Sequence, residues 1–378
     1  MEKIRVMTIV GTRPEIIRLS RVIPKLDEYC HHILIHTGQN FDYELNEIFF
    51  DELEIRMPDK FLNAAGGSAA ETIGKVIILT DAEIEKFKPD ALLLLGDTNS
   101  SLAAIAAKRR KVPIFHMEAG NRCFDMRVPE EINRRIVDHI SDVNLTYSEI
   151  SREYLLREGI SPDQIIKTGS PMYEVIQFYR KKIDASNILS QLKLNRYQYF
   201  LFSSHREENI ESTDNLDKIF LVMNSLAEKY HLPVIVSTHP RMRKYLEANL
   251  NTFHPLVRFH KPFGFLDYIA LQISARVVLS DSGTITEESS ILNFPALNLR
   301  DVQERPEGFE EASVMFVGLN LSRILQALKI LENQGRDSVR TLEIVRDYKV
   351  LNLSEKILRI ILSYTNLIDQ KIWRRYQV

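Results

Sequence analysis

Short runs of apolar residues alternate with longer amphipathic stretches along most of the chain. The runs are rich in Val, Ile, Leu and Phe, which favour β-strands, and the stretches between them space their apolar residues as helices do. In the first half, the runs predict strands at 4–10, 32–37, 91–95, 113–117, 143–147 and 164–168. Strands that alternate with helices predict βαβ units and a parallel sheet, so the predicted fold class is α/β.

A second series of the same kind follows a predicted helical stretch at 173–192. Its strands are predicted at 199–203, 233–237, 257–260, 277–280 and 295–299. The two series indicate a first domain at 1–172 and a second domain at 196–353. The remaining segment, 354–378, has an amphipathic helical pattern, and we expect it to pack back on the first domain.

Composition narrows the class of protein. A length of 378 residues is typical of two domains. The 49 basic and 51 acidic residues give a net charge of −2, which argues against a strongly basic nucleic-acid-binding protein. Two cysteines, Cys30 and Cys123, are too few for a disulfide framework and favour a reducing compartment. No apolar run approaches the ~18 residues that a membrane-spanning helix needs. We therefore expect a soluble cytoplasmic protein with neither a nucleic-acid nor a membrane partner.

Ligands of open parallel sheets bind beyond the carboxyl ends of the strands, so the residues after each strand are the first candidates for a site. The first strand is followed by Gly11, which permits a tight turn, and by Thr12 and Glu15, which have capping-box spacing. Arg13 would lie at the start of the next helix, where anions are favoured. An ordinary capped helix with a surface arginine would have the same local sequence.

Acidic residues follow two later strands. Asp97 comes after the third predicted strand, and Glu118 ends the fourth, on the same strand face as His116. Neighbouring parallel strands end side by side, so both carboxylates could serve one site, and paired carboxylates are a simple means of general acid–base catalysis. Glu130 lies near the start of the next helix. Two simpler interpretations stay open, because Asp97 could cap a helix and Glu130 could complement a helix dipole.

In the second half, the fourth predicted strand meets Ser282, Gly283 and Thr284 where a helix should begin. Backbone N–H groups and small hydroxyls at such a position would form an anion pocket. Glu288, farther into the same helix, could reach a ribose diol. A simple helix cap at Asp281 or Ser282 is the alternative, but a cap alone does not need the run of hydroxyls.

His205 stands in a polar cluster directly after the first strand of the second half, where a catalytic role and a structural role are equally open. The sequence contains no Walker-type loop and no G-x-G-x-x-G, and neither its histidines nor its cysteines have metal-ligand spacing. We therefore expect neither a metal nor a dinucleotide cofactor.

Six short motifs occur in an order that is specific as a set. They are Gly11-Thr12-Arg13-Pro14-Glu15, Gly96-Asp97-Thr98, His116-Met117-Glu118-Ala119-Gly120, Pro129-Glu130-Glu131-Ile132-Asn133-Arg134, Asp281-Ser282-Gly283 and Glu304-Arg305-Pro306-Glu307. Through them the chain resembles, from residue 4 to about 365, the non-hydrolysing UDP-N-acetylglucosamine 2-epimerase family. The resemblance implies the GT-B architecture, in which two Rossmann-like domains with parallel sheets face a central cleft and the second domain binds UDP.

The resemblance also implies roles for individual residues. Its catalytic residues would be Asp97, Glu118, Glu130 and His205. Its substrate-binding residues would be Arg13, Arg18, Ser282, Gly283, Thr284, Glu288 and Arg300. It further implies a UDP-sugar substrate, no cofactor and a homodimer. The implied reaction eliminates UDP to leave a 2-acetamidoglycal, which is reprotonated on the opposite face before UDP returns.

Local variants narrow this resemblance to one branch of the family. The variants lie at 121–125, 204–209, 237–241 and 282–289. They are most similar to the bacterial capsule and O-antigen enzymes that form UDP-N-acetyl-L-fucosamine by inverting C2 of UDP-2-acetamido-2,6-dideoxy-L-talose. Arg18 stands where the family usually has Lys, and 66–74 lacks the Gln-rich pattern linked in the family to an activating second substrate molecule. The alternatives are an epimerase that converts UDP-N-acetylglucosamine to UDP-N-acetylmannosamine, a GT-B glycosyltransferase and an inactive nucleotide-sugar sensor.

Overall fold

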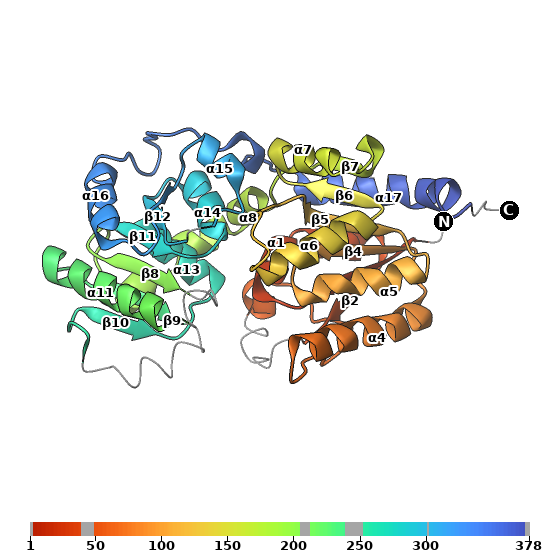
Figure 1. The fold of residues 1–378 in the computed structure, drawn as a ribbon, viewed down its shortest axis with the longest axis horizontal. Coiled ribbons are helices and arrows are strands. Elements are labelled where there is room, and N and C mark those ends of the chain that lie inside the picture. The colour runs from red at the N-terminus through yellow and green to blue at the C-terminus, as the bar shows by residue number, and fades with distance from the viewer. Residues whose placement is uncertain (1–2, 39–48, 205–211, 239–251, 301, 375–378) are drawn as a thin grey trace. The chain divides into compact units, whose positions relative to one another are not determined.

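The computed structural model describes residues 3–38, 49–204, 212–238, 252–300 and 302–374. The chain forms two compact units (Figure 1). The first unit consists of Met1–Gln177 and Asp347–Val378, and the second is Phe178–Arg346. The last part of the chain therefore belongs to the first unit, whereas the second unit is one continuous segment.

A seven-stranded parallel sheet forms the centre of the first unit, in the order β3-β2-β1-β4-β5-β6-β7. Its strands are β1 (Arg5–Val10), β2 (His31–His36), β3 (Lys60–Phe61), β4 (Ala91–Leu95), β5 (Ile114–Ala119), β6 (Val143–Thr146) and β7 (Ile165–Lys167). Every residue of β4 is buried, because helices cover both faces of the sheet. This burial explains why the middle strands have continuous apolar sequences instead of alternating ones.

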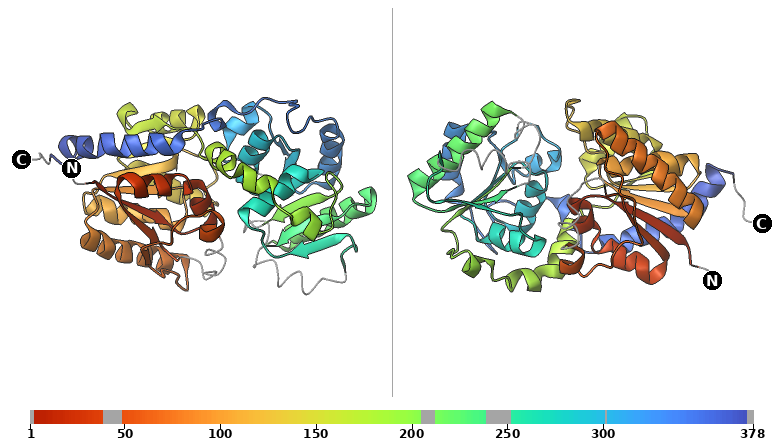
Figure 2. Two further views of the ribbon diagram at one scale, coloured as in Figure 1. Left: turned by 180° about the vertical axis from the view of Figure 1, so that it is seen from behind. Right: turned by 90° about the horizontal axis from the view of Figure 1, so that it is seen from below.

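The helices of the first unit lie between its strands or follow the last of them (Figure 1). They are α1 (Arg13–Leu19), α2 (Val22–Tyr29), α4 (Ala69–Phe87), α5 (Ala104–Arg109), α6 (Pro129–Ile140), α7 (Glu149–Arg157) and α17 (Leu353–Lys371), with α8 (Met172–Asp184) at the boundary between the units. The last of these, α17, packs against α2, and Lys25 of α2 lies 3.4 Å from Glu355 of α17. Figure 2 shows α17 running along the first unit.

A six-stranded parallel sheet forms the centre of the second unit, in the order β10-β9-β8-β11-β12-β13. Its strands are β8 (Phe200–Ser204), β9 (Val234–Thr238), β10 (Val257–His260), β11 (Val277–Ser280), β12 (Ala296–Asn298) and β13 (Met315–Phe316). Its helices are α9 (Ile188–Gln191), α11 (Thr213–Tyr230), α13 (Phe265–Ser274), α14 (Thr284–Leu292), α15 (Pro306–Glu310) and α16 (Leu321–Leu331). Apolar side chains of α11 and α16 pack with those of the sheet in one buried cluster.

Both sheets have the same Rossmann-like topology. In each, the chain builds outward from the first strand to one edge and then returns to continue on the other side of that strand. The direction reverses between β1 and β4 in the first unit and between β8 and β11 in the second. Such switch points are where open parallel sheets bind ligands. The predicted α/β class with two parallel sheets is confirmed.

All eleven predicted strands are present, with ends shifted by at most two residues. The sequence did not predict the edge strands β3 and β13, which have two residues each and so show no periodicity. The helical stretch predicted at 173–192 is broken, because α8 ends at Asp184 and α9 begins at Ile188. Ser186 lies in the break, where its hydroxyl accepts a hydrogen bond from the backbone N–H of Ile188.

Within the described part of the chain, no helix combines the length and the apolar character that crossing a membrane requires.

Candidate active site

The carboxyl ends of β1, β4 and β5 lie side by side in the first unit, since these strands are neighbours in the sheet. The backbone N–H of Gly96, just after β4, donates to the carbonyl of Met117 in β5 over 3.0 Å. Arg13 and Asp97 come shortly after β1 and β4, and Glu118 is the second-last residue of β5. The topology therefore brings two of the predicted acids, Asp97 and Glu118, to one edge of one sheet.

The turn after β1 needs glycine because of close packing. A Cβ atom on Gly11 would lie 1.9 Å from the hydroxyl of Ser100 and 2.2 Å from that of Thr37. Its backbone is not in the left-handed region, so the tight turn expected from the sequence is not the reason for the glycine. Arg13 follows as the first residue of α1, where its side chain is exposed and its guanidinium lies 5.5 Å from the ring centre of Phe49.

Glu15 closes this turn as a buried carboxyl group. One carboxyl oxygen accepts hydrogen bonds from the backbone N–H groups of Gly11 and Thr12, which is the predicted capping interaction. The other accepts a hydrogen bond of 2.7 Å from the hydroxyl of Thr98, next to Asp97. Burial raises the pKa of Glu15 from 4.5 to about 7, although these hydrogen bonds act in the opposite direction. Glu15 thus ties the end of β1 to the end of β4.

Glu118 sits in a strained part of β5. Its φ angle is +65°, and the pairing of β5 with β6 shifts register between Met117 and Ala119. Left-handed backbone at a non-glycine residue costs about 1–3 kcal/mol and is common at functional sites. The bulge interrupts the alternation of side chains, so the expectation that His116 and Glu118 share a strand face is wrong: His116 contacts Asp138 of α6, whereas Glu118 contacts α1.

A buried arginine accompanies Glu118. The guanidinium of Arg18 in α1 lies 3.0 Å from the Glu118 carboxylate, and only 3% of the Arg18 side chain is exposed. The same guanidinium is 5.5 Å from the ring centre of Tyr147. The side-chain amide of Asn121 donates to the other carboxylate oxygen of Glu118 over 3.3 Å. Arg18 and Asn121, two residues at which the sequence departs from the usual family pattern, therefore both touch Glu118.

Asp97 has a buried arginine of its own. Two nitrogens of Arg134 in α6 lie 2.9 and 2.7 Å from one oxygen of its carboxylate. Asn133 donates to the backbone carbonyl of Asp97 over 2.9 Å. The helical turn that follows β4 is capped by Thr98 and not by Asp97, so the capping interpretation of Asp97 is wrong. Asp97 is instead presented as a partly exposed, ion-paired carboxylate.

Two consecutive acids begin α6 and have different surroundings. Glu130 is half-buried in the first turn, after Pro129. Glu131 is fully buried and lies 3.2 Å from Arg134 and 2.8 Å from Arg135. The sequence analysis did not single out Glu131 or Arg134. The spacing of Glu131 to two arginines three and four residues later is the signal that could have found them.

In the second unit, the carboxyl end of β8 and the residue that follows β11 meet at the switch point. The carboxylate of Asp281 is buried and accepts a hydrogen bond of 2.7 Å from the hydroxyl of Ser204, the last residue of β8. His205, the next residue and a predicted catalytic group, lies outside the described residues. Asp281 was predicted only as a possible helix cap, whereas the structure shows that it connects the two strand ends.

The turn after β11 has the predicted position before a helix. Gly283 is the N-cap of α14 and Thr284 is its first residue, so the cap is neither Asp281 nor Ser282. The hydroxyl of Ser282 lies 3.0 Å from that of Thr284 and accepts from the Thr284 backbone N–H over 3.3 Å. Both hydroxyls are half-buried at the amino end of α14, where the helix dipole favours an anion.

Two further predicted residues of the second unit are buried and hold polar partners. Glu288 in α14 accepts a hydrogen bond of 2.6 Å from the side-chain amide of Gln272. Arg300, after β12, lies 2.9 Å from the carboxylate of Glu304. The sequence analysis did not predict Gln272, because its partner Glu288 lies in a different helix. It quoted Glu304, the partner of Arg300, only as part of a motif.

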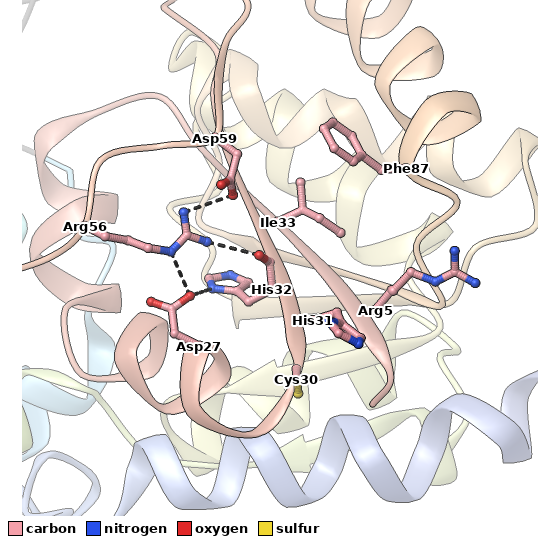
Figure 3. A pocket seen from close by; sticks show the side chains of 9 residues that line it. All are labelled: Arg5, Asp27, Cys30, His31, His32, Ile33, Arg56, Asp59 and Phe87. Carbon is pink, nitrogen blue, oxygen red and sulfur yellow. Dashed lines mark hydrogen bonds and ion pairs between the residues drawn. The ribbon is translucent and has the colours of Figure 1, made fainter. Parts of the chain in front are cut away.

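An open pocket lies at the amino ends of β1 and β2, the edge of the first sheet opposite the acidic strand ends (Figure 3). Its lining residues are Arg5, Asp27, Cys30, His31, His32, Ile33, Arg56, Asp59 and Phe87. Arg56 lies between Asp27 and Asp59, 2.9 Å from each carboxylate. None of the residues predicted for the site lines this pocket, so it is separate from the candidate active site. Among the described residues, no group of His, Cys, Asp and Glu is arranged to hold a metal ion.

Known proteins that are similar to this chain over most of its length include epimerases. A family model described as UDP-N-acetylglucosamine 2-epimerase matches residues 25–362. The chain belongs to that family, so it is an isomerase, and both the predicted family and the predicted GT-B-type α/β fold are confirmed.

Three relatives illustrate the match. The solved UDP-N-acetylglucosamine 2-epimerase of Rickettsia bellii is 49% identical, with a TM-score of 0.92 over 99% of this chain and 100% of that one. The Methanocaldococcus jannaschii UDP-GlcNAc 2-epimerase, solved in complex with UDP-GlcNAc and UDP, is 33% identical, with a TM-score of 0.88 over 95% of this chain and 100% of that one. The UDP-2,3-diacetamido-2,3-dideoxy-D-glucuronate 2-epimerase of Pseudomonas aeruginosa is 33% identical over 331 residues, 86% of this chain and 91% of its own.

Proposed function

We propose that the protein inverts C2 of a UDP-2-acetamido sugar by eliminating UDP and adding it back. The observation that carries the proposal is the pair of carboxylates at adjacent strand ends, Asp97 and Glu118, each held by a buried arginine. The names of the three relatives support it, since each is a 2-epimerase of a UDP-linked acetamido sugar.

The reaction needs proton transfer on both faces of the sugar. A base removes the C2 proton, the C2–H electron pair becomes the C1=C2 double bond, and the C1–O bond breaks so that UDP leaves with its electron pair. The 2-acetamidoglycal is then protonated at C2 on the opposite face, and UDP re-forms the bond to C1. We assign the proton-transfer roles to Asp97, Glu118, Glu130 and His205, because the chemistry requires acid–base groups on both sides of the ring.

Much of the barrier must be lowered by stabilising the departing diphosphate, since the C2 proton is not acidic. We assign that task to exposed Arg13 at the start of α1 and to the turn of Ser282, Gly283 and Thr284 at the start of α14. Glu288 would bind the ribose. Among the arginines implied by the family resemblance, we propose that Arg18 acts on the substrate through Glu118, which it contacts.

Arg300 has a corresponding place in the proposal. It lies after β12 in the sheet that carries the Ser282 turn, and it is paired with Glu304. We propose that Arg300 contributes positive charge to the binding of the UDP moiety, with Glu304 fixing the direction of its guanidinium.

For the sugar, we propose UDP-2-acetamido-2,6-dideoxy-L-talose, converted to UDP-N-acetyl-L-fucosamine for capsule or O-antigen synthesis. The support is local: the variant residues Asn121 and Arg18 both contact Glu118, so the departures from the usual family sequence surround a proposed proton-transfer group. A pocket shaped around a C6 methyl group rejects the corresponding hydroxyl only modestly, by about 10²-fold. UDP-N-acetylglucosamine is the second candidate, because the two structural relatives carry that name.

The experiment incubates the protein with each UDP-sugar separately in D₂O and follows C2 by NMR. We expect the product to carry one deuteron at C2, and long incubation to release UDP and the 2-acetamidoglycal. Epimerisation with C2 fully protiated would rule out the mechanism. A product of unchanged mass that forms from the UDP-sugar alone would exclude both a glycosyltransferase and an inactive sensor. The ratio of kcat/KM for the two sugars decides between the two substrates.

We also propose that the protein acts as a homodimer in the cytoplasm. The free thiols of Cys30 and Cys123 support a reducing compartment. Light scattering should give twice the chain mass of 43.8 kDa, and a mass of one chain would contradict the dimer.

A further inference from the structure

His116 is a fully buried histidine in β5, two residues before Glu118. Its Nε2 lies 2.8 Å from the carbonyl oxygen of Gly96, and its Nδ1 lies 2.9 Å from a carboxylate oxygen of Asp138 in α6. The Nδ1 atom is thus within ion-pair distance of this carboxylate, and the contact is an ion pair when the ring is protonated. Both ring nitrogens therefore face oxygen atoms that accept protons or hydrogen bonds.

This geometry favours the imidazolium form. A backbone carbonyl can only accept, so Nε2 must carry a proton. The carboxylate of Asp138 also faces the guanidinium of Arg122 at 2.7 Å and the backbone N–H of Gly120 at 3.2 Å, and such donors favour its ionised form. Nδ1 then carries the second proton. Burial acts to lower the pKa of His116, but the contact with Asp138, the carbonyl of Gly96 and the charge of Asp97 together raise it.

His32, a buried histidine of the same sheet, also contacts an aspartate, but its other ring nitrogen faces a hydroxyl group and not a backbone carbonyl. Nδ1 of His32 lies 2.6 Å from the carboxylate of Asp27 (Figure 3). Its Nε2 faces the hydroxyl of Thr8 at 2.9 Å. A hydroxyl can donate as well as accept, so it stabilises neutral imidazole, and burial lowers the pKa of His32. An aspartate neighbour alone therefore does not fix the charge of a buried histidine; His116 differs in that its second partner, the carbonyl of Gly96, can only accept a hydrogen bond.

The contacts of His116 join the two turns that present the acids. Gly96, which it binds directly, has a φ angle of +75° and immediately precedes Asp97. Gly120, which it reaches through Asp138, has a φ angle of +80° and comes two residues after Glu118. Both turns depend on backbone shapes that glycine adopts readily, so a fixed charge between them can hold their geometry.

We infer that His116 is a positioning residue that stays cationic and holds the turns of Asp97 and Glu118 in their reactive arrangement. Its role in turnover rests on the proposed epimerase function. The charged groups around it are Asp138 from α6, Asp97 from the end of β4 and Arg122 from the loop after β5, and Arg134 of α6 is paired with Asp97. The cation also favours the ionised form of Asp97, because opposite charges stabilise each other.

The charge is tested on the wild-type protein by long-range ¹⁵N NMR of its labelled histidines, with His116 assigned through its backbone amide. We expect both ring nitrogens to stay protonated at pH values at which an ordinary histidine is neutral. A neutral ring at pH 8 would overturn the inference. The measurement needs no substrate, so it decides the charge of His116 even if no UDP-sugar is turned over and the proposed function fails.

The role in turnover is tested with His116→Gln and the matched control His32→Gln. Glutamine at 116 can still donate to the carbonyl of Gly96 but carries no charge. We expect kcat to fall by up to ~10²-fold, because small misplacements of reacting groups have effects of that size, and the acidic limb of the kcat profile to move to higher pH as Asp97 loses a cation. His32→Gln should lower stability and leave kcat and the pH profile unchanged. Equal behaviour of the two variants would show that His116 is only structural.

Discussion

The buried carboxyl group of Glu15 should make folding stability depend on pH. Its pKa rises from 4.5 in the unfolded chain to about 7 in the folded protein, because burial opposes ionisation. Between these two values the folded state holds a proton that the unfolded state has released, so the free energy of unfolding should fall as pH rises from about 4.5 to about 7. At ~1.4 kcal/mol per pH unit, the total loss is about 3 kcal/mol.

The variant Glu15→Gln removes this titration and keeps the contacts. Its amide oxygen can accept from the backbone N–H groups of Gly11 and Thr12, and its NH₂ group can donate to the hydroxyl of Thr98, the reverse of the present bond. We expect the variant to match the wild type near pH 4.5 and to be up to about 3 kcal/mol more stable at pH 8.

The assay is urea unfolding followed by tryptophan fluorescence at a series of pH values. The chain has one tryptophan, Trp373, which lies in the first unit with its ring 5.3 Å from the Lys108 ammonium, so the signal reports on the unit that contains Glu15. Parallel stability curves for wild type and variant between pH 5 and pH 8 would refute the reasoning. The control Glu131→Gln removes a buried acid that is paired with two arginines, and it should instead lower stability.

Three further predictions concern catalysis, packing and cofactors. The volume-conserving variants of the proposed acid–base groups are Asp97→Asn, Glu118→Gln and Glu130→Gln; each should lower kcat by ~10²–10⁴-fold, and wild-type turnover in all three would make these acids purely structural. Gly11→Ala should lower the free energy of unfolding by about 1–3 kcal/mol, because the added Cβ would overlap two hydroxyls. The control Gly74→Ala, in α4, adds a Cβ where there is open space and should not lower it. Similar melting temperatures for the two variants would contradict this prediction. Activity should survive EDTA without added NAD, and loss that a divalent ion restores would reveal a metal site.

Much of the fold could be predicted because its signals are local. Apolar runs bounded by turns identify strands that are buried on both faces, and β4, for example, has the predicted bounds. The missed strands β3 and β13 owe their existence to pairing with a longer neighbour, which leaves no periodicity in two residues. The break between α8 and α9 depends on the side chain of Ser186, a local effect that helical spacing does not reveal.

The positions of the acidic site residues at the strand ends could be predicted, but the side chains that contact these acids could not. Asp97 and Glu118 could be found because parallel strands end together. Arg18 was predicted to bind substrate, but the pairing of Glu118 with Arg18 and of Asp97 with Arg134 was not predicted, because these arginines come from helices that reach the strand ends only in the folded unit. The bulge that turns Glu118 toward α1 breaks the strand alternation, which no rule of spacing anticipates. His205 stays a prediction, since it lies outside the described residues.

The assignment of α17 to the first unit has a consequence for how the chain folds as it is made. Helix α2 buries Val22, Ile23 and Leu26, and α17, which packs on it, is not available until Phe178–Arg346 has been synthesised. At ~5–20 residues per second, the first unit waits about 10–30 s on the ribosome with part of its apolar surface uncovered. The second unit, being continuous, can fold during that wait. The second unit can therefore be complete before the first, and a nascent chain that stops after Arg346 would leave uncovered the face of α2 on which α17 packs.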